Sequence, residues 1–161
     1  MVEPTHRRLL TATRLLGALA LLVIGGLHYQ QYRYAFYSSV PTIGPLFVVN
    51  FVAATALGLL LLAPVRSRLG RYGRRLHQLA AVGGIGVAGG GLVALLISEH
   101  TPLFGFMEHG YRFAIVLAVV SDAVAIVMLA LFLLCARTGR RVLSPVRSPK
   151  NQRAVAPAAE R

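Results

Sequence analysis

Residues 113–136 read FAIVLAVVSDAVAIVMLALFLLCA, an apolar run in which Asp122 is the one charged side chain. An α-helix of this length extends about 36 Å, which exceeds the ~30 Å hydrocarbon core of a bilayer. Backbone groups have no water to bind in hydrocarbon, so a segment that crosses it has to be helical. Arg112 and Arg137 flank the run, and we therefore predict a membrane-spanning helix here.

Three more apolar stretches precede this segment, and each is long enough to cross a bilayer. The predicted spans cover about residues 9–27, 46–63, 79–97 and 113–136. The composition agrees, because 56% of the residues are hydrophobic and 14% are charged, whereas soluble domains have about 25% charged residues. We therefore predict an all-α fold, a single-domain, four-span transmembrane helix bundle over residues 1–141.

The remaining segment, residues 142–161, has a different composition. It contains the pairs Ser144-Pro145 and Ser148-Pro149 among arginines and alanines, and it has few large apolar side chains. Such a segment cannot bury enough apolar surface to fold. We predict that residues 142–161 form a disordered basic cytoplasmic tail.

The basic residues indicate how the bundle is oriented. Of the 17 Lys and Arg residues, all but Arg33 and Arg112 lie at the N-terminus, between the second and third spans, or after Cys135. Because cytoplasmic loops are enriched in these residues, both termini and the central linker are predicted to be cytoplasmic, in a multi-pass protein of the cell membrane. The net charge of +12 does not indicate nucleic acid, since the clusters flank apolar spans. The predicted partners are anionic lipids of the inner leaflet, at about 1 kcal/mol per basic residue.

The third span is rich in glycine, and residues 84–89, GIGVAG, match the dinucleotide-binding pattern G-x-G-x-x-G. That pattern needs a preceding strand and an exposed helix N-terminus, and neither fits within a crossing helix. Small residues four positions apart instead allow two membrane helices to approach closely. We therefore predict Gly84, Gly86 and Gly90 at helix contacts, within this chain, in a homo-oligomer or in a larger membrane complex.

Asp122 lies ten residues after Arg112, which is about 15 Å along a helix and near the centre of the bilayer. An ionised carboxylate at that depth costs about 2.5 to 3.5 kcal/mol, so the side chain is expected to face the bundle and to be paired or protonated. Thr55 lies at a similar depth in the second span, and we predict a buried polar contact between Asp122 and Thr55. This contact is either a hydrogen bond that locks the packing or part of a proton or ligand site.

Histidine and glutamate are concentrated at the outer ends of the spans, at His28, Glu99, His100, Glu108 and His109. Their nitrogen and oxygen atoms suit zinc or copper, although they lack the spacing of known metal motifs. The simpler interpretation is anchoring at the membrane interface together with tyrosines. A haem held between His28 and His100 is a rival hypothesis, so the cofactor stays open.

Two segments of the first half carry a family resemblance. Residues 28–33, HYQQYR, are followed by residues 40–47, VPTIGPLF. Together they resemble uncharacterised small four-helix integral membrane proteins of high-GC bacteria, over the first two spans of the chain. The resemblance implies four crossings and a tyrosine-rich outer connector, and it implies no catalytic residues.

The chain carries no specific catalytic motif, so the sequence favours a non-enzymatic role. We predict an accessory, scaffold or small-ligand-binding membrane subunit. The alternative is an outward-facing metal or haem redox protein that uses His28, His100 and His109. A third hypothesis is an oligomeric transporter that relies on Asp122.

Overall fold

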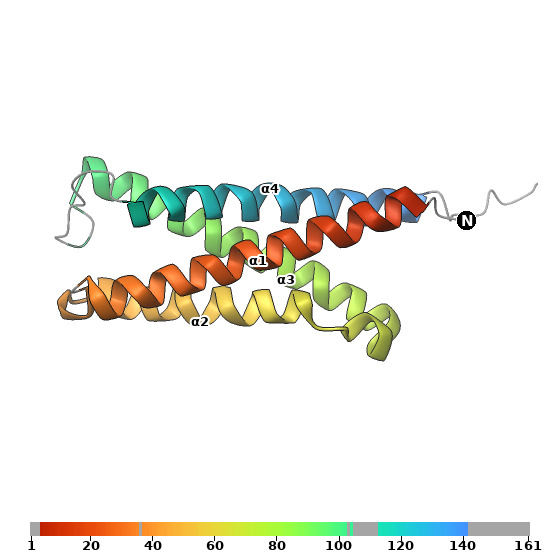
Figure 1. Ribbon diagram of the computed structural model, residues 1–161, viewed down its shortest axis with the longest axis horizontal. Coiled ribbons are helices and arrows are strands. Elements are labelled where there is room, and N and C mark those ends of the chain that lie inside the picture. The colour runs from red at the N-terminus through yellow and green to blue at the C-terminus, as the bar shows by residue number, and fades with distance from the viewer. Residues whose placement is uncertain (1–3, 36, 103, 105–112, 142–161) are drawn as a thin grey trace, which may run out of the picture.

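The computed structural model describes residues 4–35, 37–102, 104 and 113–141. Within them the chain forms four α-helices, and a short 3-10 helix lies between the first two (Figure 1). The bounds are α1 Pro4–Tyr34, η1 Tyr37–Ser39, α2 Ile43–Leu62, α3 Val65–His100 and α4 Phe113–Arg141. The predicted tail at residues 142–161 lies outside the described residues, so it stays a prediction.

All four helices are long and apolar enough to cross a membrane. The predicted all-α bundle with four spans is therefore confirmed, and its helices imply contact with lipid. The helices are longer than the apolar runs that predict them, and α3 begins well before residue 79. This difference arises because polar and charged residues at a span end can continue the helical backbone beyond the apolar part.

Successive helices run in opposite directions, so the connections alternate between two ends of the bundle (Figure 1). One end holds the start of α1, the connection between α2 and α3, and the last turns of α4. We call it the basic end, because the arginines of residues 7–14, 66–75 and 137–141 lie there. The other end is called the tyrosine end, after Tyr29, Tyr32, Tyr34 and Tyr37.

α1 lies between α2 and α4 and contacts both along much of its length, while α3 packs on α4 and α2. The core combines small and large side chains, among them Ala18, Leu21, Ala54 and Leu129, all of which are fully buried. Alanines on neighbouring helices allow the backbones to approach, and the leucines fill the remaining space. The outer surface is apolar as well, which is what lipid contact requires.

The start of α3 is set apart from the rest of the helix by Gly70. This residue has φ 50° and ψ −117°, so the helix is kinked there. A positive φ is accessible to glycine without the steric penalty that a Cβ brings. The kink turns the short segment of residues 65–69 away from the axis of the spanning helix, and the exposed Arg66 and Arg68 lie on that segment at the basic end.

Candidate functional site

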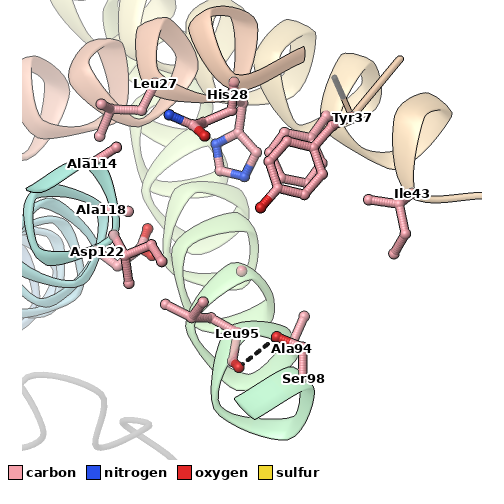
Figure 2. Close-up of a pocket in the computed structure, with 14 residues that line it drawn as sticks. Leu27, His28, Tyr37, Ile43, Ala94, Leu95, Ser98, Ala114, Ala118 and Asp122 are labelled. Atoms are coloured by element: carbon pink, nitrogen blue, oxygen red, sulfur yellow. Dashed lines mark hydrogen bonds between the residues drawn. The ribbon is translucent and has the colours of Figure 1, made fainter. Parts of the chain in front are cut away.

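The bundle contains a cavity of about 140 Å³ toward its tyrosine end (Figure 2). All four α-helices and η1 contribute to its lining. Small residues on α3 and α4 create the space, namely Gly91, Ala94, Ala114 and Ala118. Polar groups also face it, namely His28, Gln31, Tyr37, Ser98 and Asp122. A mostly apolar cavity with a few convergent polar groups is the usual form of a small-molecule site.

Asp122 is the acidic residue of this cavity. Its side chain is 3% exposed, and Figure 2 shows it directed from α4 toward the space between α4, α3 and His28. Its Oδ1 atom is buried and has no hydrogen-bond partner among the described residues. Its Oδ2 atom lies 3.7 Å from the position that a Cβ would take at Gly91. A buried acceptor without a donor is unfavourable by about 1 to 3 kcal/mol, and more when it is charged.

His28 and Asn50 form a hydrogen-bonded pair beside Asp122. The imidazole Nδ1–H of His28 donates to the carbonyl oxygen of Ile24 over 2.9 Å. The other ring nitrogen, Nε2, accepts from the Asn50 amide over 2.9 Å. This pattern assigns a neutral imidazole, because an imidazolium has no acceptor nitrogen. The Asn50 amide nitrogen also lies 3.5 Å from the Cβ position at Gly91, so it and the Asp122 carboxylate approach the same point on α3.

Aromatic rings form another wall of the cavity. The Tyr37 and Phe47 rings are stacked, with centroids 4.7 Å apart and planes 13° from parallel. The His28 ring is tilted against Phe47 at 5.0 Å. A tight turn places Tyr37 there, since a Cβ at Gly44 would lie 2.9 Å from the Tyr37 carbonyl oxygen. The connection between α1 and α2 therefore contributes to the lining of the cavity, and Tyr37 is buried.

The two residues of the predicted polar contact lie against different neighbours. Thr55 faces α1, where a Cβ at Gly25 would lie 2.5 Å from the Thr55 hydroxyl oxygen. Asp122 faces the cavity instead, and its Oδ1 has no hydrogen-bond partner among the described residues, Thr55 included. Ser121, next to Asp122, donates to the Leu117 carbonyl oxygen within its own helix over 2.7 Å. The structure therefore assigns Asp122 to the cavity rather than to a helix contact.

The described residues of the predicted metal or haem site have different surroundings. His28 lines the cavity, and both of its ring nitrogens are engaged in hydrogen bonds. His100 is exposed at the end of α3 and uses Nδ1 to bond the Leu96 carbonyl oxygen, and Glu99 precedes it on the same helix. Glu108 and His109 lie outside the described residues. Among the residues that are described, no three His, Cys, Asp or Glu side chains come close enough to hold a metal.

The three glycines predicted at helix contacts differ in their surroundings. A Cβ at Gly84 would lie 2.8 Å from side-chain atoms of both Leu21 and Leu129, so Gly84 is at the junction of α1, α3 and α4. Gly86 and Gly90 have open space where their Cβ atoms would be. These two glycines face away from the described chain, toward lipid or a second molecule.

A second buried histidine was not singled out by the sequence. His77 on α3 is 3% exposed, and its Nε2 lies 3.2 Å from the Ala63 carbonyl oxygen at the end of α2. Arg14 of α1 approaches the opposite ring nitrogen at 3.2 Å. The arrangement fits a neutral imidazole that donates through Nε2 and accepts from the guanidinium through Nδ1. The position of Arg14 within an apolar run is the signal from which a buried partner could have been inferred.

Four helices that are each long and apolar enough to span a membrane define the chain as an integral membrane protein. No protein-family model, curated protein or solved structure matches the chain. Its activity has therefore to be argued from the cavity itself.

Proposed function

We propose that the protein is a non-enzymatic membrane subunit that binds a small ligand in the cavity near its tyrosine end. The observation that carries this proposal is the buried carboxyl of Asp122, which faces the cavity and has an unpaired oxygen among the described residues. A protein that acted as a scaffold alone would gain nothing from such a group, because it weakens the folded state. A ligand that donates a hydrogen bond would offset that penalty.

We also propose that the basic end faces the cytoplasm and that the cavity lies in the outer half of the membrane. The support is the asymmetry of the arginines, since the three described clusters share the basic end. Cytoplasmic ends of membrane proteins are enriched in such residues. The ligand therefore comes from the extracytoplasmic side or from the outer leaflet.

The proposal can be tested by ligand-dependent thermal unfolding of the purified protein in lipid nanodiscs. The panel consists of small neutral, cationic and anionic molecules with on the order of six non-hydrogen atoms, because an engineered 150 Å³ cavity accommodates benzene. Ala118→Leu fills the cavity, whereas Ala123→Leu adds the same volume at an exposed site on α4. We expect at least one class to raise Tm in the wild type and in Ala123→Leu but not in Ala118→Leu.

Two results would contradict the proposed ligand binding. The proposal is wrong if no compound of the panel changes Tm of the wild type at millimolar concentration. It is also wrong if the compounds that raise Tm do so equally in Ala118→Leu, because they would then bind elsewhere.

A further inference from the structure

The charge balance of the cavity indicates what kind of ligand it takes. Asp122 is the one acidic residue among the described lining residues, and none of them is Lys or Arg. An ionised Asp122 therefore has no protein cation beside it in the described part of the chain. A buried carboxylate in this situation needs a counter-charge, or it has to remain neutral.

His28 cannot act as that counter-charge while its present hydrogen bonds persist. Its Nδ1–H is already directed to the Ile24 carbonyl oxygen, and its Nε2 accepts the Asn50 amide. Protonation of Nε2 would set two donors against each other and break the contact with Asn50. Ser98 also leaves the carboxyl unpaired, because its hydroxyl donates to the Leu95 carbonyl oxygen over 2.8 Å (Figure 2).

We infer that the cavity binds a small primary or secondary ammonium ion with a compact apolar body, and that Asp122 is its anion. This inference rests on the proposed ligand-binding function. An N–H of the ligand would donate to the Asp122 carboxylate, and a charge-assisted hydrogen bond is about twice as strong as a neutral one. The apolar body would lie against Leu95, Ala94 and Ala118, with Phe47 and Tyr37 as the aromatic wall. Aromatic rings favour cations next to them.

Ammonium fits this cavity better than a metal ion does. Calcium and magnesium need six or more oxygen ligands, and zinc needs four ligands from nitrogen, sulfur or oxygen. The described lining provides one carboxylate, and the polar atoms of His28 and Ser98 are already engaged in hydrogen bonds. The described residues hold no group of three metal-binding side chains. A primary or secondary ammonium ion needs fewer partners, because it has only two or three N–H donors and the rest of its surface is carbon.

Three molecules of the same size test the inference: cyclopentylamine, cyclopentanol and cyclopentanone. At neutral pH the amine is a cation, the alcohol is a neutral donor, and the ketone is only an acceptor. Their affinities for the wild type in nanodiscs are measured by titration of Tm or by calorimetry. We expect the amine to bind at least about tenfold more tightly than the alcohol. In Asp122→Asn the amine should lose at least about tenfold in affinity, and the alcohol less than about threefold.

Other results of the same titrations would contradict the ammonium assignment. Equal binding of amine and alcohol to the wild type would overturn the ammonium assignment and leave a ligand-binding cavity. The tightest binding by the ketone would mean that Asp122 is protonated and donates a hydrogen bond to the ligand, which also overturns the assignment. No binding by any of the three would count against the ammonium site and the proposed function together. The comparison within the wild type decides the matter even if Asp122→Asn does not fold.

Discussion

The Asn50 amide of α2 bonds the His28 imidazole of α1 over 2.9 Å, and the same imidazole is tied to its own helix through the Ile24 carbonyl. The pair crosses the interface between α1 and α2 beside the cavity. Because each nitrogen of the ring has one partner, the imidazole is held in a single orientation and a single neutral form. On this side of the cavity the polar atoms of the imidazole have hydrogen-bond partners, whereas the Oδ1 of Asp122 has none among the described residues.

We expect a double-mutant cycle with His28→Ala and Asn50→Ala to show a coupling of about 0.6 to 1.7 kcal/mol in the free energy of unfolding. Each single variant leaves one partner of the pair without its hydrogen bond. Chemical unfolding in mixed micelles provides the measurement. Val49→Ala, at an exposed site next to Asn50, is the control and should show no coupling with His28→Ala. Additive effects of the two main variants would show that the contact contributes nothing.

Replacing Asp122 by leucine should stabilise the fold rather than weaken it. The change removes a buried oxygen that has no donor among the described residues and places apolar atoms in the cavity, so the free energy of unfolding should rise by about 1 to 3 kcal/mol. Asp122→Asn should lie close to the wild type. If Asp122 instead formed the predicted hydrogen bond to Thr55, Asp122→Leu would lower stability and Thr55→Val would lower it by a similar amount.

Gly84→Leu should lower stability by about 1 to 3 kcal/mol through overpacking, because a side chain at this position meets Leu21 and Leu129. Gly86→Leu and Gly90→Leu should leave the stability of the isolated chain within about 0.5 kcal/mol, since open space lies at both sites. Thermal unfolding in detergent separates the two groups. A loss of oligomer in either exposed variant, with Tm unchanged, would show that a second copy packs on this face.

Single cysteines should report the orientation of the bundle, in a background where Cys135→Ser removes the native thiol. Thr101 and Ser38 lie at the tyrosine end and Ser67 at the basic end, and all three are exposed. We expect an impermeant maleimide to label Ser38→Cys and Thr101→Cys in intact cells, and Ser67→Cys only after lysis. Labelling of Ser67→Cys alone in intact cells would reverse the proposed orientation.

The fold can largely be predicted from the sequence, because two patterns along the chain specify it. The length of an apolar run such as residues 113–136 indicates a crossing, and the positions of arginines indicate the ends of the spans. Element bounds are less accessible, as the start of α3 at Val65 shows. The apolar part of a helix ends at the membrane surface, whereas its hydrogen-bonded backbone can continue beyond it. The apolar pattern therefore does not give the ends of the helix.

The site is harder to predict from the sequence, because the depth of a residue along a helix does not specify which way its side chain faces. Thr55 and Asp122 were paired by depth, yet Thr55 faces Gly25. Gly84 and Gly86 are two residues apart, which is about 200° around a helix, so they cannot both face the same neighbour. The pairing of His28 with Asn50 depends on the relative rotation of α1 and α2, and no local pattern in either helix contains that information.

The depth of Asp122 in the membrane has an electrical consequence. The residue lies about 14 Å along α4 from Phe113, close to the middle of a hydrocarbon core of ~30 Å. A cation that reaches the carboxyl from the tyrosine end crosses about half of the transmembrane voltage. At ~2.3 kcal/mol per elementary charge for a full crossing at 100 mV, this corresponds to about 1 kcal/mol. Occupancy of the proposed Asp122 site by a cation, including a proton, would therefore depend on the voltage across the membrane.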